Sequence, residues 1–474
     1  MSILRLLTVS ASALTLAACA VGPRYQAPQT PPATFVNADP AVFAASNPQA
    51  AWWRQFEDPV LDDLVVKGLA ANLDLRIAVA HVREARALFA DARLDQLPRV
   101  TASATYAASD QQQPGSGGQR VHGETYQGGF DASWELDLFG HVRHGVDAAK
   151  ADAGAAEADL RGAQVTVAAE VARNYFELRG AQARTAVATR NLDTSRETLR
   201  LTKTRFDVGQ GDPVDVASAQ ARLSATEAAI PTFRTAERRA ANRLAVLLGV
   251  RPGVLDAQLA PVAPRAPLAK ALPIGDASAL LRRRPDVEAA ERRLAAQTAR
   301  VGVATADLFP RVTVGGFFGV LSGDVGSLGD GASRAWSVAP TITWPGLDFG
   351  GARARLRAQE ARGDASLAVY DQTVLTALED VENAFVAYAQ QQAQLKSLAD
   401  QVSASRRASD LARIRYREGA IDFLVLLDAE RTRLEAEDGL SAAETAANVD
   451  VTAIYKALGG GWTPVAPKLA VAAK

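Results

Sequence analysis

Residues that could carry chemistry are few in this sequence. His141 and His144 are three positions apart, so on a helix they would share one face and could ligate a metal ion. No cysteine and no third histidine nearby completes such a site. The sequence also lacks His-Glu-x-x-His, Gly-x-Ser-x-Gly and a phosphate loop ending in Gly-Lys-Ser/Thr. We therefore expect a junctional polar role for the two histidines, no bound metal or cofactor, and no enzymatic activity.

A second candidate group combines charge with helical spacing. Leu424, Asp428 and Arg431 stand at i, i+4 and i+7, which places them on one face of a helix. On an ordinary surface helix, Asp428 and Arg431 would form a solvated pair that contributes little to stability. Taken without other information, the spacing favours that interpretation.

The one cysteine, Cys19, follows a segment with the layout of a secretory signal. Arg5 precedes an apolar run over residues 6–18, which is too short for a membrane anchor. The run ends in Leu-Ala-Ala-Cys, which looks like a bacterial lipobox. Removal of residues 1–18 would leave Cys19 as the N-terminus, carrying covalent N-acyl and S-diacylglycerol lipid. By resemblance to lipoprotein sorting signals, Ala20 rather than Asp at the next position favours the outer membrane. The alternative is a buried or dispensable thiol.

Composition and charge exclude some partners. Hydrophobic residues make up 48% of the 474 residues, which is typical of a folded chain. Lys and Arg total 52 against 53 for Asp and Glu, so no net field attracts nucleic acid. No basic run interleaved with aromatic residues suggests a nucleic-acid groove. Nucleic acid is therefore not expected as a partner.

An internal duplication organises most of the chain. Residues 205–209 (RFDVG) match residues 415–419 (RYREG) at an offset of 210, and the same offset carries Leu248-Gly249 onto Leu458-Gly459. Residues 251–275 contain five prolines, which exclude a long helix and suit an extended crossover. The expected domains are a signal peptide at 1–18, a lipid-anchored segment at 19–60, repeat 1 at 61–250, a Pro-rich connector at 251–275, repeat 2 at 276–460 and a tail at 461–474.

Each repeat is expected to contribute one strand hairpin. Apolar and polar residues alternate over 130–137 and again over 336–344, which indicates strands with one apolar face. Each pairs with an earlier candidate strand, near Val100–Tyr106 and Val312–Val320, across a polar or Gly-rich loop. We expect loops at residues 111–115 and in the Gly-rich stretch 315–331. Pro340 lacks the N–H that a ladder position needs.

Long helices are expected between the strands. No proline interrupts residues 139–211 or, in the second repeat, about 351–417. A heptad seam in the second helix indicates lengthwise coiled-coil packing; its members are Val374, Leu378, Val381, Phe385, Tyr388, Leu395 and Val402. Each long helix is expected to turn at Gly209 or Gly419 and return as a second amphipathic helix.

Four strands cannot close a barrel within one chain. An open strand edge in lipid leaves backbone groups unsatisfied at several kcal/mol each. Strands of this alternation, ending in tryptophan, are typical of outer-membrane strands. Closure would therefore need other copies of the chain, whereas a small soluble sandwich remains the alternative.

At these residues the sequence resembles the TolC/OprM outer-membrane factor family, in its NodT-like lipoprotein branch. The resemblance covers nearly the whole mature chain. The motifs that carry it are Cys19-Ala20-Val21-Gly22-Pro23, the paired openings Leu97-Pro98-Arg99 and Phe309-Pro310-Arg311, Arg415-Tyr416-Arg417 with Gly419, Leu426-Leu427-Asp428-Ala429, and residues 455–462. The fold that it implies is mainly α with a membrane β-barrel contribution: a homotrimer with a 12-stranded barrel and a periplasmic helical tunnel.

The resemblance also assigns roles to particular residues. By matching positions, it implies a periplasmic gate at Tyr416, Leu424, Asp428 and Arg431. Threefold symmetry would make Asp428 a ring of three carboxylates that attracts cations. Val425 stands where some relatives have a second acidic gate residue, so a double acidic ring is not expected.

The same resemblance implies partners and a function. The helical turns would be docking tips for a periplasmic adaptor (membrane fusion) protein; the tip residues are Gly209, Gln210, Gly211, Asp212, Gly419, Ala420, Ile421 and Asp422. An inner-membrane pump, of the RND type, would deliver drugs or other small molecules to this passive outer-membrane exit duct. The alternative is a structural coiled-coil envelope lipoprotein or adhesin, which would explain the anchor and heptads but not the duplicated hairpins.

Overall fold

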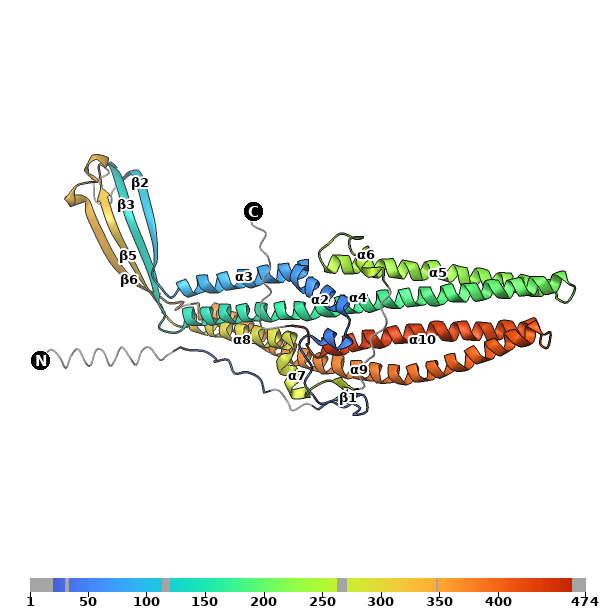
Figure 1. Ribbon diagram of the computed structural model, residues 1–474. Coiled ribbons are helices and arrows are strands. Elements are labelled where there is room, and N and C mark those ends of the chain that lie inside the picture. The colour runs from blue at the N-terminus through green and yellow to red at the C-terminus, as the bar shows by residue number, and fades with distance from the viewer. Residues whose placement is uncertain (1–19, 30–33, 113–119, 262–270, 347, 463–474) are drawn as a thin grey trace. The chain divides into compact units, whose positions relative to one another are not determined.

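The computed structural model describes residues 20–29, 34–112, 120–261, 271–346 and 348–462 (Figure 1). Cys19, the tail from 463 and part of the connector lie outside them. The chain divides into two compact units. Unit 1 comprises Met1–Gln29, Ala80–Glu157 and Glu288–Thr373, and unit 2 comprises Thr30–Val79, Ala158–Val287 and Val374–Lys474.

Unit 1 contains a four-stranded antiparallel sheet. Its strands are β2 (Arg99–Gln112), β3 (Arg120–Leu136), β5 (Arg311–Ser322) and β6 (Arg334–Thr343), in the order β2-β3-β5-β6 (Figure 1). The two predicted hairpins, β2–β3 and β5–β6, are confirmed. Short 3-10 turns η2 (Val325–Ser327) and η3 (Gly331–Ser333) connect β5 to β6. The sheet therefore ends at β2 on one edge and at β6 on the other.

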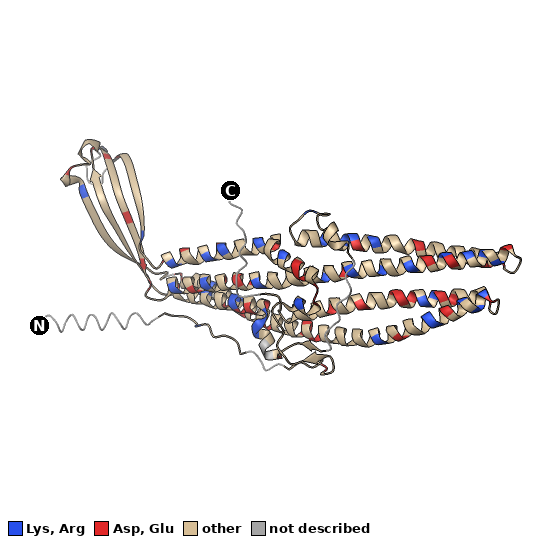
Figure 2. Cartoon of the chain, viewed as in Figure 1, with Lys and Arg blue, Asp and Glu red and all other residues tan. Residues whose placement is uncertain are grey.

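The alternation predicted for the strands leaves large apolar side chains exposed on this sheet. Phe130 is 58% exposed, Trp336 75% and Ile342 69%. Charged residues are sparse on the strands but frequent along the helices (Figure 2). An apolar sheet surface of this kind is costly in water and suits a lipid environment.

Three strand predictions were wrong in detail. Residues 111–112 extend β2 rather than forming a loop, because they pair with residues 120–121 of β3. The first glycines of the stretch 315–331 lie within β5, where Gly319 pairs with Gly129 of β3. The strands approach closely at this pair, since a Cβ on Gly129 would lie 2.6 Å from the Phe318 carbonyl oxygen. Trp344 follows β6, since Thr343 already pairs with the first residue of β5, and its indole instead donates to the Leu308 carbonyl over 3.1 Å.

Pro340 is accommodated by its position in the sheet. It lies opposite Val314 on β6, an edge strand, and proline is tolerated on edge strands because its missing N–H can point away from the ladder. The register of β5 and β6 continues on both sides of it.

Four helices dominate the described chain. They are α4 (His141–Asp207, 67 residues), α5 (Pro213–Leu247), α9 (Phe349–Arg417, 69 residues) and α10 (Phe423–Ala457). In unit 2, α5 returns beside α4 and α10 beside α9 (Figure 1), with the ion pairs Arg196–Glu227 and Arg406–Glu437 joining the members of each pair. The two predicted long helices and their returning partners are confirmed.

The remaining elements were not predicted individually. They are β1 (Phe43–Ala44), η1 (Trp52–Phe56), α2 (Pro59–Ala71), α3 (Leu73–Leu94), α6 (Asp256–Leu259), β4 (Leu272–Pro273), α7 (Ala277–Arg283) and α8 (Pro285–Ala306). Strands β1 and β4 pair in parallel. Within its described residues, the connector therefore holds a short helix and a strand that pairs with β1, and the expected extended crossover over 262–270 lies outside the described residues.

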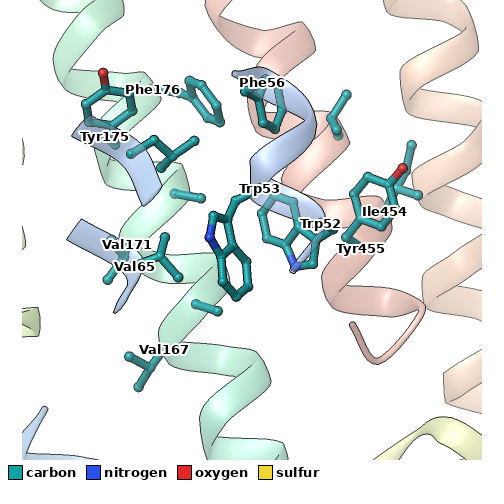
Figure 3. Packing of buried hydrophobic residues seen from close by; sticks show 14 of the residues in the cluster. Trp52, Trp53, Phe56, Val65, Val167, Val171, Tyr175, Phe176, Ile454 and Tyr455 are labelled. Carbon is teal, nitrogen blue, oxygen red and sulfur yellow. The ribbon is translucent and has the colours of Figure 1, made fainter. Parts of the chain in front are cut away.

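The main core of unit 2 gathers aromatic side chains between the helices. Trp52, Trp53 and Phe56 of η1 insert beside Tyr175 of α4 and Tyr455 of α10 (Figure 3). Trp52 stacks on Tyr455 with ring centroids 5.3 Å apart. The central part of the predicted heptad seam of α9 packs into the same core, where Val381 and Phe385 are fully buried, and Tyr388 is 2% exposed. Within the described residues, no helix has both the length and the apolar character needed to cross a bilayer.

Candidate functional site

The site begins at the turn between α9 and α10. Gly419 adopts φ +75°, a left-handed conformation that favours glycine. Its amide donates to the Tyr416 carbonyl, and the Ala420 amide donates to the Arg415 carbonyl, which is the Schellman pattern. Gly209, with φ +76°, ends α4 in the same way. Both predicted glycine turns are therefore confirmed.

Helix α10 leaves this turn with a buried and an exposed face. Phe423 and Leu426 are buried, at 2% and 0% exposure, and form a small second core with Tyr416 and residues of α4 and α5. Leu424 and Val425, between them, are exposed. Because a helix turns about 100° per residue, the face opposite the core carries the candidate gate residues.

Three of the four candidate gate residues lie together on that exposed face. Leu424 is 65% exposed, and the Asp428 and Arg431 side chains are 67% and 53% exposed. An Arg431 Nη donates to Asp428 Oδ1 over 2.7 Å, one helical turn apart. This hydrogen bond, with the nearby Glu435 carboxylate, raises the pKa of Arg431 above its ordinary value. The face thus presents one carboxylate held by one guanidinium.

The fourth candidate, Tyr416, lies apart from this face. Its ring is 2% exposed, packs 5.7 Å from Phe423, and lies under the Arg205 guanidinium at 4.6 Å. Arg205 also donates to the Tyr416 carbonyl over 2.5 Å. Among the described residues, the Tyr416 hydroxyl has no hydrogen-bond partner. Within one protomer, then, Tyr416 supports the turn and does not donate to Asp428.

The predicted docking tips are mostly exposed. Of these residues, Gly211 and Ile421 are half-buried and the rest exposed. The first tip also carries exposed apolar side chains: Phe206 is 43% exposed, Val208 63% and Val214 64%. An apolar cluster at a helical turn is a surface suited to packing against another protein.

Sequence reasoning missed a buried polar group behind the gate face. Glu430 of α10 is 3% exposed and accepts hydrogen bonds from Thr198 of α4 and Arg413 of α9. A signal was present in the sequence, because Phe423, Leu426 and Glu430 stand at i, i+3 and i+7 and share the buried face.

The two histidines occupy the expected kind of polar junction in unit 1. His141 lies 3.4 Å from Glu135 and 3.6 Å from Asp307 and also contacts Arg311, while His144 donates from Nε2 to the Val21 carbonyl over 2.8 Å. In the part of the chain that the structure describes, no cluster of three or more His, Cys, Asp or Glu side chains could hold a metal ion.

Comparisons with known proteins agree with one another. The family profile described as "Outer membrane efflux protein" matches residues 64–250 and 277–460. Outer membrane protein OprJ of Pseudomonas aeruginosa is 34% identical over 457 residues, 95% of this chain and 94% of OprJ. Nodulation protein T of Rhizobium leguminosarum bv. trifolii is 32% identical over 466 residues, 96% of this chain and 97% of that protein. The solved outer-membrane channel OprN superposes with a TM-score of 0.92 at 49% identity, covering 94% of this chain and 100% of that chain.

Proposed function

The chain belongs to the outer membrane efflux protein family, and from that premise we propose that three copies form one passive exit duct for drugs or other small molecules. Members of this family are outer-membrane channels of efflux systems, with a barrel and a periplasmic helical tunnel. The sheet is the observation that supports a trimer. Its four strands expose apolar side chains, and β2 and β6 form its two unpaired edges within the protomer. Pairing of β6 with β2 of the next copy satisfies the backbone groups of both edges, apart from the N–H that Pro340 lacks, and gives twelve strands.

The gate of this duct is formed by the exposed face of α10. Three Asp428 carboxylates around the threefold axis attract cations and repel one another. Arg431, bonded to Asp428 within each protomer, offsets part of that repulsion. Leu424 narrows the same constriction, and Tyr416 holds the turn from which α10 starts.

The proposed assembly includes two other proteins and a lipid. A periplasmic adaptor docks at the tips, where Phe206 and Val214 offer apolar contact area, and connects the duct to an inner-membrane pump of the RND type. Acyl chains on Cys19, exposed by removal of residues 1–18, anchor the N-terminus. The domains follow the two repeats, 61–250 and 276–460, joined by the connector 251–275.

A planar bilayer tests both the pore and the gate. Asp428→Ala should reduce cation preference and weaken block by divalent cations, because the ring loses its charge. Arg431→Ala should raise resting conductance, because the carboxylates lose a donor while their repulsion remains. Reversal potential in a salt gradient measures the selectivity.

Asp193→Ala is the matched control for the gate experiment. Asp193 and Arg196 form an exposed pair on α4 with the same i, i+3 spacing, at 3.3 Å. The control should retain the selectivity of the unmodified channel. An unchanged reversal potential in Asp428→Ala would show that Asp428 is an ordinary surface carboxylate, and absence of discrete conductance steps would refute the pore itself.

The lipid anchor is tested separately. Cys19→Ser leaves no thiol to acylate, so labelling with radioactive palmitate should disappear and some protein should leave the membrane fraction, while the channel still folds. Undiminished palmitate incorporation in this variant would contradict the proposed anchor.

A further inference from the structure

A buried carboxylate joins three helices directly behind the proposed gate. Glu430 of α10 is 3% exposed, and its Oε1 accepts from Thr198 Oγ1 over 2.8 Å and from Arg413 Nη2 over 3.1 Å. Thr198 belongs to α4 and is itself 4% exposed, and Arg413 belongs to α9. One oxygen atom therefore links α10 to α4 and to α9.

Burying the Glu430 carboxylate costs desolvation free energy, so a structural role that only a polar group can serve is expected here. The other residues on this face near the turn, Phe423 and Leu426, are apolar and fully packed. A leucine at position 430 would continue that face without the desolvation cost of a carboxylate. Buried polar groups of this kind often fix which register two helices adopt, because any other register leaves the charge unpaired.

The position of Glu430 ties this register to the gate. Glu430 is two residues beyond Asp428, so the two side chains project about 200° apart around α10. When Glu430 is bonded to Thr198 and Arg413, Asp428 and Leu424 therefore lie on the exposed face of α10, away from α4 and α9. If α10 rotated by one residue, about 100°, Glu430 would leave its donors and the gate face would turn away.

Other links along α10 lie farther from the turn. Arg184 binds Asp438 through two hydrogen bonds of 2.7 Å, and Arg406 binds Glu437 over 2.6 Å. Among the described side-chain links between α10 and α4, the Thr198–Glu430 bond is the one nearest to Asp428 along the helix. It is thus placed to control the rotation of the gate end in particular.

We propose that Glu430, held by Thr198 and Arg413, is a positioning residue that keeps α10 rotated in the closed register of the gate. This inference rests on the proposed gate at Asp428. Opening then requires the carboxylate to leave at least one donor, so the strength of this contact sets how often the resting channel opens.

The chain offers a closely matched pair of threonines for the test. Thr202 lies one turn beyond Thr198 on α4 and is also fully buried, but its hydroxyl donates to the Thr198 carbonyl of its own helix. Valine has nearly the shape of threonine, so Thr198→Val and Thr202→Val both preserve packing. They differ in whether an interhelical hydrogen bond is lost.

The experiment compares resting open probability in planar bilayers for the full-length, membrane-extracted channel. Thr198→Val should raise open probability about ten-fold, the size expected for loss of a hydrogen bond to a charged group. Thr202→Val should leave it unchanged, and Thr198→Ser, which keeps the hydroxyl, should restore it. Thermal unfolding is measured in parallel, because a merely structural role would alter stability without separating the two valine variants in conductance.

Each outcome decides the inference. Equal open probabilities for Thr198→Val and Thr202→Val, whether raised or not, would overturn it. If Asp428→Ala changes the reversal potential while Thr198→Val leaves open probability unchanged, the proposed gate survives and the positioning role fails. If Asp428→Ala has no effect on the reversal potential, the gate and the inference resting on it both fail.

Discussion

The turn between α4 and α5 and the turn between α9 and α10 have the same backbone and different side-chain chemistry. Gly209 and Gly419 occupy equivalent repeat positions with φ of +76° and +75°. Phe206 and Tyr416, also equivalent, differ sharply: Phe206 is 43% exposed and Tyr416 2%. The Arg205 guanidinium covers the Tyr416 ring. Duplication has therefore preserved the turn and assigned one copy an exposed apolar surface and the other a packed core.

This difference has a functional consequence. The exposed residues of the first turn are available to another protein, whereas the packed residues of the second turn orient the charged face of α10. Under the proposed function, one repeat serves contact with a partner and the other serves the gate. Substitutions at equivalent positions of the two turns test whether the side chains differ in importance and whether the shared backbone matters equally in both.

The largest expected effect comes from the two aromatic residues. Tyr416→Ala should lower the free energy of local unfolding at the second turn by about 3 kcal/mol, because it removes a buried ring. Phe206→Ala should cost less than about 0.5 kcal/mol at the first turn, since surface substitutions usually do. Hydrogen exchange of the amides in the first turns of α5 and α10 measures both values.

Tyr416→Phe is the control for this pair. The hydroxyl has no partner among the described residues, so its removal should leave exchange unchanged or slower. If Phe destabilises the turn as much as Ala does, the hydroxyl has a partner outside the protomer. Equal effects of Tyr416→Ala and Phe206→Ala would show that the two aromatic rings contribute equally to their turns, which contradicts the proposed difference between them.

A smaller and equal effect is expected at the two glycines. An L-residue in the left-handed region costs about 1–2 kcal/mol, so Gly209→Ala and Gly419→Ala should each speed local exchange by that amount. A Cβ at Gly209 meets no atom within 4 Å, and at Gly419 the nearest atom is Arg205 Nη2 at 3.7 Å, so steric contact adds little at either turn.

Asparagine, which tolerates this conformation better, should reduce the penalty at both positions. Clearly unequal effects of the two alanine substitutions would show that one turn is held by contacts beyond its own backbone.

Local signals in the sequence were sufficient for the two long helices with their returning partners, the glycine turns and the strand hairpins. The absence of proline over 139–207 and the heptad seam through Val381 and Phe385 depend on neighbours within a few residues. The same holds for the glycines that end α4 and α9. These elements could be predicted because their determining interactions are close in sequence.

The parts that could not be predicted depend on packing between distant segments. Glu430 and Thr198 are 232 positions apart, and no local pattern indicates that they meet. Phe206 and Tyr416 have equivalent local sequences, yet Arg205 and a small core with residues of α4 and α5 cover the Tyr416 ring, whereas Phe206 stays exposed. The ends of β2 and β6 were missed for a similar reason, because ladder partners rather than composition determine where a strand stops.

The smallest expected effect distinguishes the starts of the two returning helices. Asp212 caps α5: its carboxylate accepts from the Val214 amide over 2.7 Å. The equivalent Asp422 makes no side-chain cap to α10, where buried Phe423 follows it. Asp212→Ala should therefore lower the free energy of local unfolding at the start of α5 by about 1 kcal/mol. Asp422→Ala should leave the corresponding free energy of α10 nearly unchanged.

Asp212→Asn keeps an oxygen acceptor and should retain most of the cap. Hydrogen exchange at the first turn of each helix again supplies the measurement, with the amide of Val214 as the direct reporter of the cap. A clear loss of protection in Asp422→Ala, equal to that in Asp212→Ala, would mean that the second turn relies on the same local cap as the first. In that case packing of Tyr416 and Phe423 would not be what starts α10, and the contrast between the two turns would reduce to the exposure of one aromatic ring.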